Sequence, residues 1–358
     1  MEDDAGAHLP LPLDNTVERA TLEPPITWSN GQEDAAYGLN HDRRHQCRSQ
    51  DETNPRDIAM SLDPARLTNW PAVRDFVPTA HHDTYQFIST SAADLSGKSV
   101  FITGASKGIG KGIALSFARA GCSRIAVAAR TGIDELKQQI LSAAQTAGRP
   151  EPHILAITLD VTSAEGVAAA ATAVSDAFGG ALDILINNAG RTSAMVPLTE
   201  GDVDDWWATW ELNIRATYLC TRAFLPLLLK SSIRTVIITS SAGAHMLIQN
   251  FLGYQTSKTA LCRFAEFLAK EYEDQGLVAL AVHPGDVLTD IAACLGDEMA
   301  SIFKDTPELT GDTLVWLTKE RRDWLSGRFI SVTWDMQELE QKKDEVVSKD
   351  LLKMRLTV

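Results

Sequence analysis

Short apolar runs alternate with longer amphipathic stretches from residue 95 onward. The runs lack the in/out alternation of a half-exposed strand, which indicates strands buried on both faces of a sheet. Alternation of strands with helices implies right-handed crossovers and a parallel, doubly wound sheet. The sequence therefore predicts one α/β domain over 95–358 with helices flanking the sheet. The predicted strands cover 98–103, 124–129, 154–159, 182–186, 235–239 and 278–282, and the predicted helices lie at about 113–118, 135–145, 163–177, 202–229 and 254–274.

The first 94 residues do not share this pattern. Residues 1–60 hold five prolines and long polar stretches without apolar periodicity. Such a segment cannot bury enough apolar surface to offset the entropy of ordering, so we expect a disordered extension over 1–60. A start of translation at Met60 is a hypothesis. Residues 61–94 are expected to form a lead-in that packs on the domain surface through four aromatic residues, Trp70, Phe76, Tyr85 and Phe87.

The charge balance excludes several classes of partner. Lys plus Arg is 33 and Asp plus Glu is 47, which gives a net charge of −14. An acidic chain repels nucleic acid and anionic lipid. No apolar run reaches the roughly 20 residues needed to span a bilayer, and the first residues lack the basic and apolar regions of a secretory signal. We therefore expect no nucleic-acid or membrane partner and a cytoplasmic setting.

The cysteines predict neither a disulfide framework nor a metal site. All five (47, 122, 220, 262 and 294) are scattered, without a CxxC pair, and we interpret them as reduced thiols. His41, His45 and Cys47 lie close together in the sequence, but no second Cys or His pair completes a ligand set. We therefore expect no bound metal.

A glycine-rich turn lies directly between the first predicted strand and its helix. It reads Thr103-Gly104-Ala105-Ser106-Lys107-Gly108-Ile109-Gly110. Glycines permit backbone angles that other residues avoid, and they let a pyrophosphate approach the main chain. The N–H groups at the start of the helix then favour a phosphate. In this strand–turn–helix context the motif predicts a dinucleotide site.

The spacing TGxxxGxG resembles that of the short-chain dehydrogenase/reductase family, whose nucleotide-binding domain is a Rossmann-type fold. Three further segments agree with this family: Asn187-Asn188-Ala189-Gly190 after the fourth strand, Tyr254-Gln255-Thr256-Ser257-Lys258, and Pro284-Gly285-Asp286-Val287-Leu288-Thr289 after the sixth strand. The resemblance covers essentially all of 95–335. It implies cofactor contacts at Thr103, Gly104, Ser106, Lys107, Gly108, Ile109, Gly110, Arg130, Asp160, Asn188, Ala189, Gly190, Pro284, Gly285, Val287 and Thr289, together with Tyr254 and Lys258.

The residues near the second strand favour NADP(H) over NAD(H) as the cofactor. An NAD site places an acidic residue at the end of this strand, on the ribose hydroxyls. Here that position is Ala129, and it is followed by Arg130. The guanidinium is a permanently charged fork that suits a phosphate, and Lys107 adds a second cation. Asp160 resembles the family residue that lies near the adenine amino group, although an acid at a strand end also serves as a helix cap.

Tyr254 and Lys258 are the candidate proton-transfer pair. They lie four residues apart, so on a helix they share one face. A free Tyr has a pKa near ~10, and a nearby cation lowers it toward the working pH. In the family the Tyr is the general acid in reduction and the base in oxidation. The Lys lowers its pKa and holds the nicotinamide ribose.

The resemblance adds a serine and an asparagine to this pair. The family serine lies about thirteen residues before the Tyr, which selects Ser241, with Ser240 as the alternative. Asn213 matches the family asparagine on the long helix that helps to hold a proton-relay water near the Lys. Ala216 replaces a glycine that is frequent three residues later. The predicted catalytic residues are therefore Asn213, Ser241, Tyr254 and Lys258.

The residues expected around the substrate are mainly apolar. In the family the pocket is built by the loop after the fifth strand and by the segment after Thr289. His245 is a candidate for the pocket lining, whereas His283 is interpreted as structural. An apolar lining suits a non-ionic, fairly bulky carbonyl compound. The candidate apolar residues are Met246, Leu247, Ile248, Phe251, Leu252, Leu295, Met299 and Phe303.

Two function classes remain open from the sequence. The first is an NADP(H)-dependent oxidoreductase that interconverts a ketone and a secondary alcohol, and the second is a non-catalytic NADP-binding sensor or scaffold. A binding module has no need for Tyr254 and Lys258 together, so the set favours the enzyme. The tail, from 329–335 onward to Val358, departs from the family's common glycine-rich ending and resembles oxidoreductases of fungal specialised metabolism. Family members often form homodimers or homotetramers, and the resemblance implies the same here.

Overall fold

The computed structural model describes residues 73–289 and 303–356. Within these ranges the chain forms a seven-stranded parallel sheet with the order β3-β2-β1-β4-β5-β6-β7. The strand order reverses between β1 and β4, as in doubly wound folds. The strands are β1 (Ser99–Thr103), β2 (Arg124–Ala129), β3 (His153–Thr158), β4 (Ile184–Asn187), β5 (Thr235–Thr239), β6 (Val278–His283) and β7 (Arg328–Ser331). The predicted α/β architecture is confirmed.

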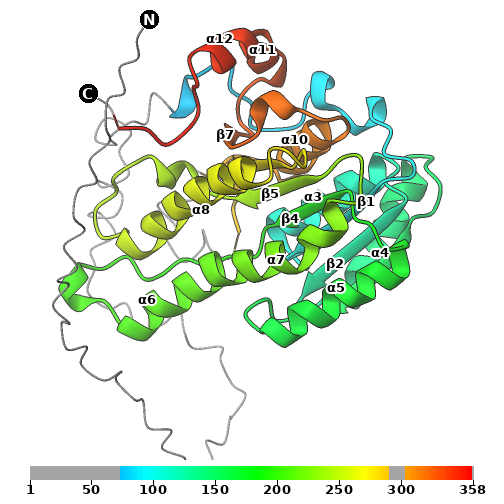
Figure 1. Cartoon of the computed structure of the whole chain (residues 1–358), viewed down its shortest axis with the longest axis horizontal. Coiled ribbons are helices and arrows are strands. Elements are labelled where there is room, and N and C mark those ends of the chain that lie inside the picture. The colour runs from blue at the N-terminus through cyan, green and yellow to red at the C-terminus, as the bar shows by residue number, and fades with distance from the viewer. Residues whose placement is uncertain (1–72, 290–302, 357–358) are drawn as a thin grey trace, which may run out of the picture. The chain divides into compact units, whose positions relative to one another are not determined.

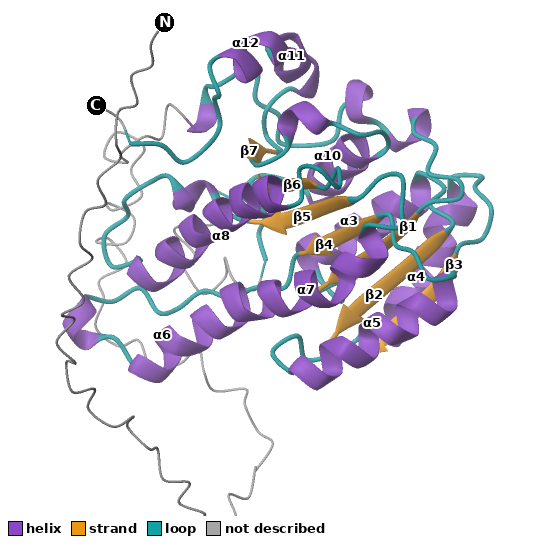
Figure 2. Ribbon diagram, in the orientation of Figure 1, coloured by secondary structure: helices purple, strands orange, loops and turns teal. Residues whose placement is uncertain are grey.

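Helices cover both faces of the sheet (Figure 2). α3, α4 and α10 pack together on one face, and α5, α7 and α8 lie on the other (Figure 1). The longer helices are α3 (Gly108–Arg119), α4 (Ile133–Thr146), α5 (Ala164–Phe178), α6 (Val203–Trp210), α7 (Ala216–Leu228), α8 (Leu252–Glu271) and α10 (Pro307–Thr318), and two short ones follow, α11 (Met336–Gln341) and α12 (Lys343–Ser348).

The core explains why the strands carry unbroken apolar runs. Every residue of β1 is buried, because helices cover the sheet on both sides. Phe101 stands opposite Ala126 on one neighbouring strand and Leu185 on the other. Its ring stacks on Phe224 of α7, with the ring centres 4.2 Å apart. The inner strands are therefore held by contacts above and below the sheet as well as by the ladder of hydrogen bonds.

The helix predicted over 202–229 is interrupted at one point. α6 and α7 are joined by a π-helical turn over Glu211–Arg215, which contains Asn213. A π turn inserts an extra residue into the hydrogen-bonding ladder and is often found at functional sites. The axis of this long helix is therefore continuous, while its main-chain pairing changes at the candidate catalytic asparagine.

The sequence did not predict α10 or β7. β7 pairs in parallel with β6, with Ala281 opposite Phe329, so the tail that departs from the family's ending supplies the last strand. Trp334 just after it is buried, and its indole N–H donates to the carbonyl oxygen of Val73 at 2.7 Å. The carboxyl-terminal part of the domain is thus packed against the lead-in.

The lead-in contacts the domain through the expected aromatic residues that lie in the described range. The ring of Phe76 lies 5.1 Å from that of Trp334, and the ring of Phe87 lies 6.0 Å from that of Trp316. The hydroxyl of Tyr85 accepts the main-chain N–H of Met336 at 2.6 Å. Trp70, Met60 and the extension expected over 1–60 lie outside the described residues.

Candidate active site

The glycine turn after β1 is shaped so that side chains are excluded. Gly104 and Gly108 have φ values of +64° and +53°, which other residues rarely adopt. A Cβ at Gly110 would overlap the carbonyl oxygen of Gly104 and come within 2.6 Å of the side-chain nitrogen of Asn188. The turn therefore presents the N-terminus of α3 without side chains in the way, as a phosphate site requires.

The segment after β4 is bonded directly to this turn. The side-chain amide of Asn188 donates to the carbonyl oxygens of Thr103 and Gly104 at 2.9 and 3.2 Å. The main-chain N–H groups of Asn188 and Ala189 donate to the Thr103 hydroxyl at 3.0 and 3.1 Å. Asn188 and Ala189 thus fix the geometry of the turn at the point where the strand order reverses.

The candidate residues for the 2′-phosphate belong to the glycine turn and to the loop after β2. Lys107 and Arg130 are exposed. The loop that follows β2 lies against the turn, because a Cβ at Gly132 would be 3.5 Å from the Cβ of Ser106. The two cations therefore belong to loops that contact each other.

Asp160 follows β3, and its side chain is hydrogen-bonded to Thr162 in the turn after that strand. Its carboxylate accepts the main-chain N–H and the hydroxyl of Thr162 at 2.9 and 2.8 Å. Burial pushes the pKa of Asp160 upward, but these two hydrogen bonds and the charge of Arg130 outweigh it, so the pKa lies below its usual value. Both hydrogen bonds go to the Oδ1 atom, while the charge of Arg130 acts on the same carboxylate.

Tyr254 stands in the first turn of α8, beside the end of β5. Its ring stacks on Phe251, with the ring centres 4.8 Å apart. Burial raises the pKa of Tyr254, a hydrogen bond with Ser241 lowers it by less, and the charge of Asp286 raises it further. The net direction is upward, which differs from the lowered pKa expected from the sequence. In this structure the phenol therefore holds its proton.

The two candidate serines have different surroundings. The Ser241 hydroxyl is bonded to Tyr254 and also accepts the main-chain N–H of Gly243 at 3.1 Å. Ser240 is buried, and its hydroxyl donates to the carbonyl oxygen of Lys258 at 2.9 Å. The geometry therefore favours Ser241 as the group beside the phenol, with Ser240 fixing the main chain behind it.

Lys258 lies one helical turn after Tyr254 and is buried. Its Nζ atom is 5.6 Å from the centre of the Tyr254 ring, and it donates to the carbonyl oxygen of Thr239 at 2.9 Å. Burial lowers the pKa of Lys258 to about 8, although Cys262 acts in the opposite direction. At neutral pH the ammonium is still protonated, so a cation lies beside the phenol.

Asn213 is tied to the main chain around the pair. Its side-chain oxygen accepts the N–H of Arg191 at 2.9 Å, and its nitrogen donates to the carbonyl oxygen of Arg191 and to the Ser257 hydroxyl at 3.0 and 2.9 Å. Ser257 in turn donates to the carbonyl oxygen of Tyr254 at 2.7 Å. Asn213 thus links the segment after β4 to the helix that carries Tyr254.

Two supporting residues were missed by the sequence analysis. Ser257 lies inside the Tyr–Lys motif, so its position was visible but its role was not. The side chain of Gln255 donates to the carbonyl oxygens of Gly243 and Met246 at 3.0 and 2.8 Å and accepts the N–H of Ile248 at 2.9 Å. It supports the loop after β5. Gln255 lies in the same motif as Ser257, but the sequence does not mark it for that role.

The Pro284–Thr289 segment lies beside the glycine turn. Gly285 has a φ of +84°, and Val287 is buried. The Thr289 methyl group would be 3.0 Å from a Cβ at Gly108, so the far end of this segment packs on the first residue of α3. The segments after β1, β4, β5 and β6 therefore meet at the carboxyl edge of the sheet.

The histidines near this edge are held by packing. His283 is buried, which lowers its pKa to about 4 although Asp305 acts in the opposite direction. The His245 ring packs edge-on against Phe329 at 4.4 Å, and burial lowers its pKa, as does His283. Both rings are therefore neutral at neutral pH.

The candidate apolar lining divides into buried and exposed residues. Met246, Ile248 and Phe251 are buried, whereas Leu247 and Leu252 are exposed. Phe303 is half-buried, and Leu295 and Met299 lie outside the described residues.

Among the described residues, no group of three or more His, Cys, Asp or Glu side chains is arranged to hold a metal ion. No helix of the described ranges is long and apolar enough to cross a bilayer.

Comparisons with known proteins agree with this geometry. A family model described as short chain dehydrogenase matches residues 98–300. The chain is 46% identical over 299 residues to the short chain dehydrogenase mpl6 of Monascus purpureus, which covers 84% of this chain and 100% of that protein. It is 42% identical to the short chain dehydrogenase andI of Emericella variicolor, over 80% of this chain and 97% of that protein.

Solved structures show the same likeness. A protein described as a short chain dehydrogenase from Shigella flexneri, in complex with NADP, aligns with a TM-score of 0.57 and 25% identity, over 68% of this chain and 99% of that chain. A short chain dehydrogenase from Salmonella enterica aligns with a TM-score of 0.60 and 27% identity, over 70% of this chain and 100% of that chain. The alignment therefore includes nearly all of each solved chain.

Proposed function

The chain belongs to the short chain dehydrogenase family, and from that premise we propose that it is an NADP(H)-dependent oxidoreductase. The proposed reaction interconverts a ketone and a secondary alcohol on a small, mainly apolar organic substrate. The observation that carries the proposal is the meeting of Ser241, Tyr254 and Lys258 at the carboxyl edge of β5, which is separated in the sheet only by β4 from β1 and its glycine turn.

The residues at this edge fit a nicotinamide dinucleotide. The glycine turn leaves the N-terminus of α3 open, as a pyrophosphate needs. A Cβ at Gly190 would lie 3.2 Å from the Asn213 side-chain oxygen and 3.5 Å from the Lys258 Nζ atom, so this glycine keeps the space beside the lysine open. Lys258 would hold the ribose there, and the Pro284–Thr289 segment would lie against the nicotinamide.

Arg130 and Lys107 support NADP(H) as the cofactor. Both are exposed cations on loops that touch each other, and the position after β2 carries no carboxylate that would repel a 2′-phosphate. The Shigella flexneri protein described above was solved with NADP. The paired cations and this likeness point in the same direction.

The chemistry assigns a distinct role to each catalytic side chain. A bound nicotinamide dinucleotide supplies the hydride that carbonyl reduction needs. Tyr254 donates its phenolic proton to the carbonyl oxygen, which is why a phenol that holds its proton suits reduction. Ser241 donates a hydrogen bond to the same oxygen and polarises the carbonyl group. Lys258, protonated below a pKa of about 8, stabilises the phenolate that remains.

The proposed substrate class follows from the residues around the phenol. Phe251 stacks on Tyr254, and Met246 and Ile248 are buried in the same loop. We further propose that the reaction belongs to specialised metabolism, because the tail from 329 to Val358 resembles oxidoreductases of that kind.

A fluorescence titration tests the cofactor first. We expect NADPH to bind the full chain more tightly than NADH. A screen of bulky apolar ketones should then reveal consumption of NADPH by its loss of absorbance. Absence of binding by either dinucleotide would contradict the proposal, and binding without turnover of any ketone would favour the sensor or scaffold alternative.

A further inference from the structure

Two residues outside the family match, His82 and Asp305, are bonded to each other beside the proposed nicotinamide wall. The His82 Nδ1 atom lies 2.6 Å from the Asp305 Oδ1 atom. A carboxylate only accepts hydrogen bonds, so the imidazole is the donor. The Asp305 side chain is 2% exposed, whereas the His82 side chain is 62% exposed. A buried carboxylate is therefore stabilised by a donor from the lead-in.

The second oxygen of Asp305 holds the main chain of the Pro284–Thr289 segment. Asp305 Oδ2 accepts the N–H of Asp286 at 2.6 Å, and the Asp305 N–H donates to the carbonyl oxygen of Asp286 at 3.1 Å. A Cβ at Gly285 would lie 2.8 Å from the same Oδ2 atom. The turn at Gly285, with its φ of +84°, is thus built around the carboxylate.

The segment held in this way reaches both ends of the proposed cofactor site. Val287, the residue after Asp286, is buried and pairs with Asp305 in an isolated parallel bridge. Thr289 packs on Gly108, where α3 begins. A displacement at Asp286 would therefore shift the proposed nicotinamide wall and its contact with the phosphate-binding turn.

The lead-in around His82 is held independently of the imidazole. The carbonyl oxygen of His82 accepts the N–H of Thr306 at 3.0 Å, and the Asp83 carboxylate accepts the Thr306 hydroxyl at 2.7 Å. The Thr84 hydroxyl donates to Asp312 at 2.6 Å. The lead-in thus lies along α10 (Figure 1). Replacement of the His82 side chain therefore removes one donor without releasing the segment.

We propose that His82 is a positioning residue for the cofactor: through Asp305 it fixes the Asp286 main chain, and so the wall against which the nicotinamide binds. This inference rests on the proposed function. By this inference the lead-in contributes to the cofactor site. Neither His82 nor Asp305 lies in the 98–300 family match. Without the imidazole donor, the Asp305 carboxylate is buried with one partner fewer and holds Asp286 less firmly.

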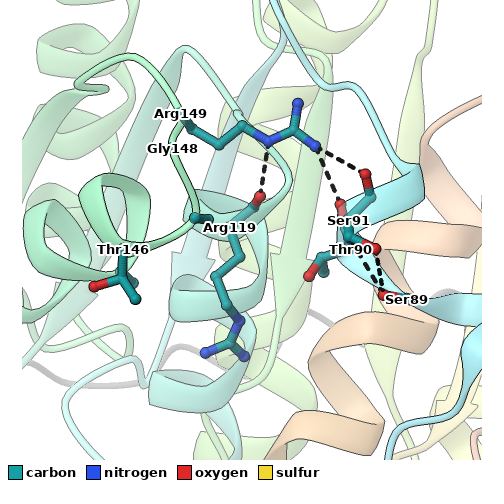
Figure 3. Close-up of a pocket in the computed structure, with 9 residues that line it drawn as sticks. Ser89, Thr90, Ser91, Arg119, Thr146, Gly148 and Arg149 are labelled. Atoms are coloured by element: carbon teal, nitrogen blue, oxygen red, sulfur yellow. Dashed lines mark hydrogen bonds between the residues drawn. The ribbon is translucent and has the colours of Figure 1, made fainter.

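A second anchor of the lead-in provides a matched control. The guanidinium of Arg149 donates to the carbonyl oxygens of Arg119, at 3.1 Å, and of Ala93, at 2.7 Å. It also reaches the main chain of Thr90 and Ser91, as Figure 3 shows for the pocket that these residues line. Arg149 precedes β3, so this anchor lies at the amino edge of the sheet, opposite the proposed cofactor site.

The experiment compares His82→Ala, His82→Asn and Arg149→Met in the full chain. NADPH affinity is measured by fluorescence titration, and hydrogen exchange is followed in peptides that contain 284–289. We expect His82→Ala to weaken NADPH binding by about tenfold and to speed exchange there, as loss of a donor to a charged group implies. His82→Asn should restore both, because its amide nitrogen, like Nδ1, is one bond from Cγ. Arg149→Met should lower the unfolding temperature and leave NADPH affinity unchanged.

Three results would overturn the inference: unchanged affinity and exchange in His82→Ala, no restoration by His82→Asn, or an equal loss of affinity in Arg149→Met. If His82→Ala does not fold, the near-isosteric pair His82→Asn and His82→Asp gives the same contrast, since only the first retains a donor. If the unmodified chain does not bind NADPH, the proposed function fails. The exchange measurement still decides whether His82 holds the segment.

Discussion

The ammonium of Lys258 lies 5.6 Å from the centre of the Tyr254 ring, and it is held there by the carbonyl oxygen of Thr239. Burial raises the pKa of Tyr254 and lowers the pKa of Lys258, because it favours the neutral form of each side chain. The phenol therefore keeps its proton, while the ammonium keeps its charge only below pH about 8. These protonation states support the proposed role of Tyr254 as proton donor, with a cation beside the phenolate.

Removal of the phenolic hydroxyl should abolish turnover and spare cofactor binding. Tyr254→Phe keeps the ring that stacks on Phe251 but has no proton to donate. We expect kcat to fall by about 100-fold or more, the usual contribution of a general acid. Steady-state kinetics and NADPH titration measure the two effects. Tyr218→Phe, on an exposed side chain of α7, is the control and should be fully active; comparable turnover in both variants would refute the assigned role.

Burial of the Lys258 ammonium should lower the free energy of unfolding by an amount that depends on pH. The pKa of Lys258 is lowered from 10.5 to about 8, so below pH 8 the folded and unfolded states are both protonated and the whole cost of burying the charge is present. Between pH 8 and 10.5 the folded state loses its proton first and the cost fades. Lys258→Met should therefore raise the unfolding temperature near neutral pH, with an advantage that shrinks as pH rises through this range.

Thermal unfolding of Lys258→Met and the parent, at about pH 7 and about pH 10, measures this difference. Lys270→Met is the matched control, because Lys270 lies on the same helix with 81% of its side chain exposed. A surface substitution of this kind changes stability by no more than about 0.5 kcal/mol. An advantage of Lys258→Met that grows with pH would contradict the prediction.

A reversal of charge at the end of β2 should change the preferred dinucleotide. Arg130→Asp replaces an exposed cation by a carboxylate directly after Ala129, the position at which NAD sites carry an acidic residue. We expect NADPH affinity to fall by about 10- to 100-fold and NADH affinity to change little, since only NADPH carries the 2′-phosphate. Paired titrations measure both, and Lys343→Asp makes the same charge change far along the chain on α12. Equal losses for the two dinucleotides would argue against the assignment.

The glycine turn should not tolerate a single added methyl group. In Gly110→Ala the new Cβ overlaps the Gly104 carbonyl oxygen and crowds the Asn188 side chain, neither of which can retreat without loss of the turn. We expect a loss of about 1–3 kcal/mol in the free energy of unfolding, together with loss of NADPH binding. Urea unfolding and titration test this. Gly201→Ala, where the nearest atom is 3.6 Å from the new Cβ, should behave as the parent does.

The sequence predicted those parts of the molecule that depend on short-range patterns. Strands β2 and β5 begin and end at the predicted residues, and the other predicted strands agree within two residues. Each is a buried run of apolar residues, so its pattern is set by its own neighbours. The four motifs were likewise visible, because the family's spacing is fixed within each segment.

Features in the carboxyl-terminal and amino-terminal parts of the domain could not be predicted from local sequence patterns. α10 is buried on nearly all sides, so it lacks the polar face by which a helix is recognised in a sequence. β7 is only four residues long and gains its stability from pairing with β6. The role of His82 depends on a carboxylate 223 residues away, which no local pattern encodes.

The sequence by itself determined the parallel α/β domain, the family and the candidate residues, because periodicity and motif spacing are properties of short stretches of chain. Only the tertiary structure decided which serine lies beside the phenol and that the Asn213 side chain is hydrogen-bonded to Arg191 and Ser257. It also decided that the pKa of Tyr254 is raised by burial and not lowered. Burial and hydrogen-bond partners are set by segments that meet from distant parts of the chain, so no window of sequence contains them.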